Sequence, residues 1–331
     1  MVIDQRNAGA ATANTISGYV VDRWQVVQSP TTGKVVGQQN AGSVTPPVGF
    51  NNYYGITSQS AFSIVAGSVY TFIQPIEGFN FADMAWGTAN AQTVTLSFWV
   101  RSSLTGTFGG SLGNGSSFNR SYPFTYTISS ANTWEQKTIT IAGDTTGTWA
   151  GATSGIGVYV NFGLGVGSTF SGTAGAWAAG DLRSATGATS VVGTNGATFY
   201  ITGVQLEKGS TATSFDYRPY SAELAMCQRY FVLTNPTNQQ RCGGMWGTTY
   251  TSTGGHLTGL VPVPMRTAPT VTAGGTSNTF YMSNVNATSA GTFGTFATSV
   301  LIIDAEVSSM SASSVGQPIQ YNGQLSITAE L

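Results

Sequence analysis

The chain carries very little charge. Only 8% of its 331 residues are Asp, Glu, Lys or Arg, and the formal net charge is −1, whereas ordinary soluble chains have roughly 25% charged residues. No cluster of Lys and Arg is present to neutralise phosphates, so nucleic acid is excluded as an expected partner. An anionic membrane surface is disfavoured for the same reason. No apolar run reaches the roughly 20 residues of a membrane-spanning helix, so no membrane insertion is expected.

Residues for nucleophilic or metal chemistry are equally scarce. His256 is the single histidine, and its Gly-Gly-His-Leu setting resembles no nucleophile elbow. One histidine with two distant cysteines is too few for a zinc site. The spacing of those cysteines, Cys227 and Cys242, permits a disulfide but does not require one.

The acidic residues are scattered, which argues against a glycosidase with paired carboxylates. Asp304 and Glu306 share one strand face, where we expect solvated positions or an intersubunit contact. A calcium ion at Asp144 stays open, although no Asp-x-Asp-x-Asp loop is present. The sequence therefore predicts a protein that is not an enzyme and has no cofactor.

What the chain has in abundance is glycine, threonine, valine and aromatic residues, including 43 Gly, 14 Tyr and 17 Phe. This composition favours short strands joined by tight turns. The predicted strands of the first two thirds are residues 17–27, 51–56, 68–73, 93–101, 124–128, 135–141, 155–162 and 199–204. Residues 81–86 form one expected helical turn. No 40-residue repeat is visible, so an all-β, two-sheet jelly-roll sandwich is favoured over a propeller.

The stretch 197–209 is predicted to close this sandwich. The long Gly-, Ala-, Ser- and Thr-rich segment 163–196 before it is expected to pass over an edge of the sandwich. The seam 215–230 after it is helix-prone from Ala222 to Arg229, with Pro219 starting the turn.

The predicted domains are accordingly residues 1–214, a connecting seam 215–230, and a smaller C-terminal β-domain 231–331. The predicted strands of the C-terminal domain are residues 231–233, 259–264, 300–307 and 324–331. Its core is thin, which favours burial through oligomerisation, and a homotrimer is predicted.

Aromatic residues on polar strand faces or in loops are the candidate binding residues, because aromatic rings stack on the apolar faces of sugars while nearby polar groups bind the hydroxyls. The candidates are Trp99 with Arg101, Tyr159 with Asn161, and Trp246, Tyr250 and Tyr281. In the predicted strand 93–101, residues Thr95, Ser97, Trp99 and Arg101 form the expected solvated face. The alternative for an outward tryptophan is that a loop or the second sheet covers it.

Several motifs in order resemble a family of tailed-phage virion proteins. They are Asp4-Gln-Arg-Asn-Ala-Gly9, Asp22-Arg-Trp24, Gln74-Pro-Ile-Glu-Gly78, Leu96-Ser-Phe-Trp-Val-Arg-Ser102, Gly143-Asp-Thr-Thr-Gly-Thr-Trp149, residues 199–209 and residues 215–230. The family comprises tail-fibre or host-attachment proteins with a jelly-roll domain similar to carbohydrate-binding modules. The resemblance covers roughly residues 3 to 231, and residues 262–269 resemble only loosely the variable ends of such proteins.

The resemblance implies a non-enzymatic, oligomeric component of the virion and transfers no catalytic residue. The first hypothesis is a tail-fibre or fibre-tip protein that attaches to host-surface polysaccharide, with itself and other virion tail proteins as partners. The alternative is a structural virion subunit, a capsid-decorating or connector protein, without a ligand. If a single domain meets the host, we expect it to be the C-terminal one.

Overall fold

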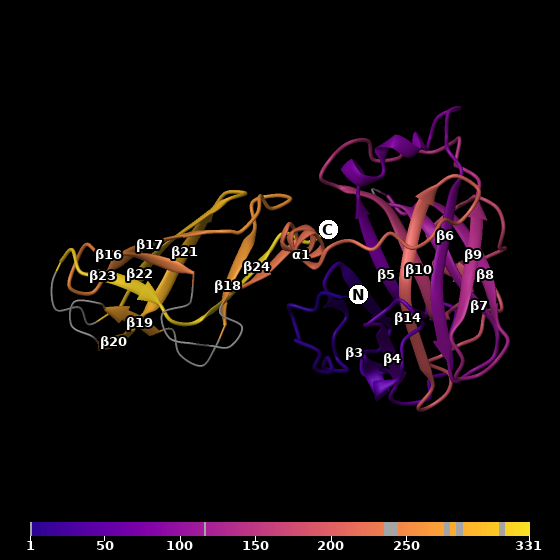
Figure 1. The fold of residues 1–331 in the computed structure, drawn as a ribbon, viewed down its shortest axis with the longest axis horizontal. Coiled ribbons are helices and arrows are strands. Elements are labelled where there is room, and N and C mark those ends of the chain that lie inside the picture. Colours follow the sequence, from indigo (N-terminus) through magenta and orange to yellow (C-terminus); the bar gives the residue numbers. More distant parts are fainter. Residues whose placement is uncertain (1, 116, 235–243, 275–278, 283–286, 311–314) are drawn as a thin grey trace. The chain divides into compact units, whose positions relative to one another are not determined.

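The computed structural model describes residues 2–115, 117–234, 244–274, 279–282, 287–310 and 315–331 (Figure 1). The chain divides into two compact units, Met1–Arg218 with Leu331, and Pro219–Glu330. The division falls inside the stretch predicted as a seam, and the helix of that stretch belongs to the second unit. Both units are built of antiparallel sheets, so the predicted all-β class, a jelly-roll sandwich followed by a smaller β-domain, is confirmed.

The first unit is a sandwich of two sheets, with strand orders β1-β2-β5-β10-β7-β8-β12 and β3-β4-β14-β6-β9. The strands of the first sheet are β1 Gly18–Val21, β2 Trp24–Ser29, β5 Val69–Glu77, β10 Ile156–Val166, β7 Gly106–Asn114, β8 Arg120–Ile128 and β12 Ala178–Ala179. Those of the second are β3 Val35–Gln39, β4 Tyr54–Ser58, β14 Thr198–Lys208, β6 Val94–Ser102 and β9 Glu135–Ile141. A short parallel pair, β11 Ser171–Gly172 and β13 Ser184–Ala185, and three 3₁₀ turns complete the unit.

The core of the sandwich follows from alternation along the strands. In β6 the side chains of Val94, Leu96, Phe98 and Val100 are fully buried between the sheets, as the sequence predicts. Each such side chain contributes about 1.5–3 kcal/mol of hydrophobic stabilisation.

Strand β7 was not predicted, because glycine at positions 106, 109, 110 and 113 gives it little apparent strand propensity. The packing requires at least one of these glycines. A Cβ at Gly110 would overlap the carbonyl oxygen of Asn161 and lie 2.5 Å from the Phe124 ring. A sequence that looks like a turn therefore forms a central strand.

The segment between β10 and β14 passes along the β8 edge of the seven-stranded sheet, as predicted, where β12 pairs with β8, and it also covers part of the outer face of that sheet. Its strand β13 contacts β7, β8 and β10, which are three neighbouring strands. Ser184 of β13 lies directly above Gly109 and Gly163, where a side chain would collide with it. The part of the outer face that lies beneath β13 is consequently buried.

Strand β14 lies in the middle of the five-stranded sheet, between β4 and β6, and its end anchors the exit of the chain from the unit. The carboxylate of Glu207 accepts hydrogen bonds from the Thr213 amide (2.9 Å) and hydroxyl (2.7 Å). Oε1 of Gln205 accepts one from the Asp216 amide at 2.9 Å. The Gln-Leu-Glu motif thus has a structural role.

The second unit holds helix α1 and two sheets, of strand orders β15-β24-β18 and β20-β19-β23-β16-β17-β22-β21. The bounds are α1 Tyr220–Gln228, β15 Phe231–Leu233, β16 Met245–Thr249, β17 Gly255–Leu260, β18 Thr270–Gly274, β19 Thr279–Met282, β20 Ala287–Ala290, β21 Thr292–Thr298, β22 Ile302–Ser308, β23 Pro318–Tyr321 and β24 Gln324–Thr328.

Two sequence predictions for this unit are settled by these bounds. Helix α1 begins after Pro219, as predicted. The predicted strand 259–264 is wrong: β17 ends at Leu260, before the two prolines at 262 and 264 that cannot donate to a sheet. Cys227 is buried on α1, and Cys242 lies outside the described residues, so their pairing stays open.

Candidate carbohydrate-binding site

Strands β19, β23, β16, β17 and β22 are neighbours in the second unit's large sheet (Figure 1). One row of side chains crosses these five strands. Tyr281 of β19 is paired with Gln320 of β23, Gln320 with Trp246 of β16, Trp246 with Thr258 of β17, and Thr258 with Asp304 of β22. Directly paired residues of an antiparallel sheet project from the same face. The sheet therefore gathers an aromatic, an amide, a second aromatic, a hydroxyl and a carboxylate in one line, the Trp246 row.

The Trp246 row lies on the face opposite to the core. Its sequence neighbours Met245, Leu257, Ile303 and Ile319 are buried in the core cluster of the unit. Trp246 is 57% exposed, and its indole makes no hydrogen bond to any described residue. An exposed tryptophan in the middle of a sheet face offers a flat apolar surface with polar groups on both sides.

The polar groups beside Trp246 are oriented by their strands. The Thr258 hydroxyl donates a hydrogen bond of 2.7 Å to Oδ1 of Asp304, which leaves Oδ2 of that carboxylate directed away from this bond. The next row along the same strands consists of Thr248, His256 and Glu306, all exposed. Together they supply the hydroxyl, imidazole and carboxylate groups that bind sugar hydroxyls.

The other two predicted binding residues of this unit, Tyr281 and Tyr250, are less exposed than Trp246. Tyr281 reaches the Trp246 row through its register but is only 9% exposed. Tyr250 is 51% exposed and follows β16 in the turn to β17, where its amide donates to the Gly254 carbonyl. The structure thus brings Trp246 and Tyr281 into one row and leaves Tyr250 at the end of the neighbouring hairpin.

In the first unit, Trp99 and Arg101 lie on the outer face of the five-stranded sheet. Trp99 of β6 is paired with Gln136 of β9 and Thr202 of β14, and Arg101 with Tyr200. Trp99 and Arg101 are half-buried and Gln136 is exposed.

The prediction that the whole face is solvated is wrong, since Thr95 and Ser97 are buried. The chain after β14 lies beside them, and the Thr95 hydroxyl donates to the Gly209 carbonyl at 2.8 Å. The accessible part of β6 on this face is therefore the end that carries Trp99 and Arg101.

Tyr159 and Asn161 of β10 lie on the face opposite to the core, as predicted, but they are only 8% and 2% exposed. The ring of Tyr159 is stacked against Phe118 at 4.6 Å. The amide nitrogen of Asn161 donates to the Ser111 hydroxyl at 3.1 Å. The expectation that this pair forms an open sugar-stacking surface is wrong, because Phe118, between β7 and β8, and Arg183, in the segment after β10, both cover Tyr159.

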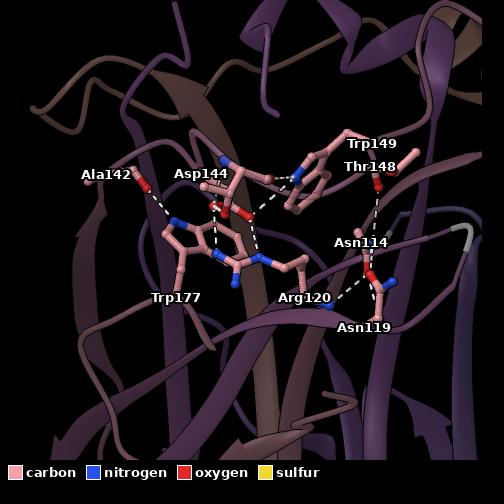
Figure 2. A network of polar contacts seen from close by, with 9 residues as sticks. Asn114, Asn119, Arg120, Ala142, Asp144, Thr148, Trp149 and Trp177 are labelled. Carbon is pink, nitrogen blue, oxygen red and sulfur yellow. Dashed lines mark hydrogen bonds and ion pairs between the residues drawn. The ribbon is translucent and has the colours of Figure 1, made fainter. Parts of the chain in front are cut away.

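Figure 2 shows a polar network of the first unit that the sequence did not predict. Arg120 donates two hydrogen bonds to Asp144, from Nε to Oδ2 (2.8 Å) and from Nη2 to Oδ1 (2.7 Å). The indole of Trp149 donates to Asp144 Oδ2 at 3.4 Å, and that of Trp177 to the Ala142 carbonyl at 2.7 Å. Both carboxylate oxygens of Asp144 are thus engaged by protein donors, which does not favour the calcium site left open above.

The same network fixes the protonation state of Asp144. Burial by itself would raise the pKa of this carboxyl, but the hydrogen bonds from Arg120 and Thr146 outweigh burial and hold the pKa below its ordinary value of 3.8. Asp144 is consequently ionised at neutral pH and acts as the anchor of the loop that carries Trp149.

The described part of the chain has neither a metal-binding cluster nor a helix that could span a membrane. Among those residues, no three His, Cys, Asp or Glu side chains gather in a way that could hold a metal ion. No helix in the same part of the chain has the length and apolar character needed to cross a membrane.

No protein-family model matches the chain, and no curated protein matches it. Three solved structures that are similar at low identity are the following. The enzymatically active domain of tailspike protein 4 of bacteriophage CBA120 has 13% identity and a TM-score of 0.33, covering 59% of this chain and 21% of that one. The family 11 carbohydrate-binding module of a Clostridium thermocellum cellulase has 13% identity and a TM-score of 0.30, covering 61% and 97%. TmCBM61 in complex with β-1,4-galactotriose has 8% identity and a TM-score of 0.30, covering 60% and 100%.

The structural neighbours therefore include a phage tailspike domain and carbohydrate-binding modules, and this chain spans about a fifth of that tailspike chain. Gln320, Thr258 and Asp304 were not predicted as members of the Trp246 row. Gln320 and Thr258 lie on the two strands directly beside Trp246, and Asp304 lies one strand further. All three are distant from Trp246 along the chain, so only the strand register reveals them. The visible signal was the alternation of polar and apolar residues in 302–308.

Proposed function

We propose that this protein is a non-enzymatic virion protein of the tail-fibre or fibre-tip type, which attaches the particle to host-surface glycan through the Trp246 row. The observation that carries the proposal is a tryptophan 57% exposed at the centre of a sheet face, with Gln320 on one side and the Thr258–Asp304 pair on the other. A sugar ring stacks on the indole while its hydroxyls bind the amide and the carboxylate.

The site is formed on rigid strands, which suits recognition of a repeating polymer. Residues on adjacent strands are about 4.7–4.9 Å apart, so the five-residue row offers a platform long enough for several sugar units. The proposal gives the row a binding role: the Asp304 carboxylate accepts a hydrogen bond from the Thr258 hydroxyl, and Glu306 follows in the next row on the same face. We place the glycan on the row without any bond cleavage.

Binding of the purified chain to host cell-surface polysaccharide or to a glycan array tests the proposal. Trp246→Ala removes the stacking surface and leaves the core untouched, and Tyr220→Ala is the matched control, because Tyr220 is 62% exposed on α1 and outside the row. We expect bound glycan to be lost in the first variant and retained in the second. Equal binding by both variants would rule out the Trp246 row as the glycan platform.

A structural virion subunit is the second candidate, and a specific observation favours it. Leu260 and Ile302 are paired across β17 and β22 and are 66% and 41% exposed. They continue the exposed apolar surface of Trp246 along the same face. Such a stripe also suits a protein partner, and a second copy of the chain in the predicted homotrimer would cover it.

The two candidates are separated by variants of the stripe and by the location of the subunit. If the stripe is a subunit contact, Leu260→Ser with Ile302→Ser converts trimers to monomers in sedimentation at micromolar concentration and leaves glycan binding intact. A monomeric wild-type protein at that concentration would contradict the trimer. Labelling of intact particles that places the subunit on the capsid shell would contradict the tail-fibre proposal.

A further inference from the structure

The Trp99 end of the first unit's five-stranded sheet has a charge that nothing in the described residues neutralises. Arg101 projects from this face, and its Nε donates a hydrogen bond of 2.9 Å to the Asn132 carbonyl. Its guanidinium carbon lies 5.4 Å from the centre of the Tyr200 ring. These two contacts fix the plane of the guanidinium but use one of its five N–H donors.

Two other arginines of the unit are neutralised by carboxylates. Arg120 is bound to Asp144, and Arg183 is paired with Asp181. Within the described parts of the chain no carboxylate is paired with Arg101, although it is half-buried. A held guanidinium with free terminal nitrogens is a preorganised site for a planar anion, which it binds through two parallel hydrogen bonds.

Trp99 stands beside this charge, two residues earlier on the same face of β6. The indole nitrogens of Trp86, Trp134, Trp149 and Trp177 all donate hydrogen bonds to protein oxygens. Trp99 makes none to a described residue, and its side chain is half-buried. Gln136, the exposed cross-strand partner of Trp99, adds an amide that can donate and accept.

We propose that Trp99, Arg101 and Gln136 form a second binding site, specific for a carboxylated sugar such as the uronic acid residue of an acidic polysaccharide. The ring of the sugar lies on the indole, its carboxylate is bound by the terminal nitrogens of Arg101, and a hydroxyl binds Gln136. This site goes beyond the glycan binding proposed for the Trp246 row and does not depend on it. The two surfaces differ in charge, since the Trp246 row and its neighbours carry Asp304 and Glu306.

The test uses the full chain and oligosaccharides of galacturonate, glucuronate and N-acetylneuraminate, each compared with its neutral methyl ester. Esterification keeps the ring and removes the charge. We expect at least one acid form to bind and its ester to bind at least about tenfold more weakly, a difference of about 1.4 kcal/mol. Arg101→Gln is expected to reproduce this loss, Arg101→Lys to lose part of the affinity, and Trp99→Ala to weaken acid and ester alike.

Three controls keep the outcome decisive. Lys208→Gln removes an exposed positive charge of the same unit and should leave binding of the acid unchanged. Gln136 is exposed, so Gln136→Ala should fold normally. We expect this variant to bind the acid several-fold more weakly, which provides a second readout if Arg101→Gln fails to fold. Competition by dextran sulfate tests whether the surface binds polyanions in general and not carboxylated sugars in particular.

The proposal is overturned if none of the acids binds, or if acid and ester bind equally. It is also overturned if Lys208→Gln weakens binding of the acid as much as Arg101→Gln does. A third contrary result is that dextran sulfate competes as effectively as the carboxylated sugars and that this competition is lost in Arg101→Gln. If Trp246→Ala leaves glycan binding unchanged while Arg101→Gln weakens binding of the acid, the result contradicts the proposed function of the Trp246 row and supports this second site.

Discussion

Replacing Asp144 by asparagine should destabilise the first unit by about 2–3 kcal/mol. The Asp144 side chain is 3% exposed, and that of Arg120 is 20% exposed. Besides the two bonds from Arg120, Oδ1 accepts bonds from the Thr146 amide (3.2 Å) and hydroxyl (3.0 Å). Breaking a fully buried ion pair costs about 3–5 kcal/mol, and the value is lower here because water reaches the guanidinium. For a unit of this size the loss corresponds to about 4–12 °C in melting temperature.

Chemical and thermal unfolding measure this loss, with Asp181→Asn as the matched control. Asp181 is paired with Arg183 but is 31% exposed, so its replacement should cost less than about 1 kcal/mol. Because the native pKa of Asp144 lies below its ordinary value, the carboxylate stabilises the fold above the unfolded pKa of about 3.9. That contribution is lost as the pH falls through the native pKa. A loss no greater than that of Asp181→Asn, or one that grows toward acid pH, would refute the reasoning.

Three further predictions concern the first unit. Gly110→Ala should destabilise it by about 1–3 kcal/mol in denaturant unfolding, because the added methyl group overlaps the Asn161 carbonyl; an unchanged midpoint would mean that β7 has room there. Burial raises the pKa of Asp22, so wild-type stability should fall as the pH rises from the unfolded pKa to the native one, and Asp22→Asn should remove that slope in unfolding measured from pH 3 to 7. Glu207→Ala should cost about 1 kcal/mol and speed proteolysis after residue 208, since the Thr213 bonds are lost; unchanged cleavage would show that other contacts hold the segment.

Much of the sandwich could be predicted from local pattern. In 93–101 and 155–162 the apolar residues alternate, and alternation alone predicts which face is buried. Strand β7 could not be predicted, since its glycines are explained only by the backbone and side chains that press against them. The small sheet of the second unit was only partly predicted, because Thr270–Gly274 has no large apolar residue besides Val271.

The candidate sites show the same limit. The sequence identified Trp246 and Trp99, because a large ring among polar residues is unusual. It could not distinguish these from Tyr159, whose alternation is as regular, since Tyr159 is buried by Phe118, between β7 and β8, and by Arg183, in the segment after β10. The partners of Trp246 are 12 to 74 residues away along the chain and meet it through strand register alone.

The affinity of the Trp246 variants for host cell-surface polysaccharide tests the central claim most directly. Titration calorimetry would compare the wild type with Trp246→Phe, Trp246→Ala and the control Tyr220→Ala. The stacking account predicts a modest loss for Trp246→Phe, at least a tenfold loss for Trp246→Ala, equivalent to about 1.4 kcal/mol, and no loss for Tyr220→Ala. Wild-type affinity in Trp246→Ala, with the fold intact, would contradict it.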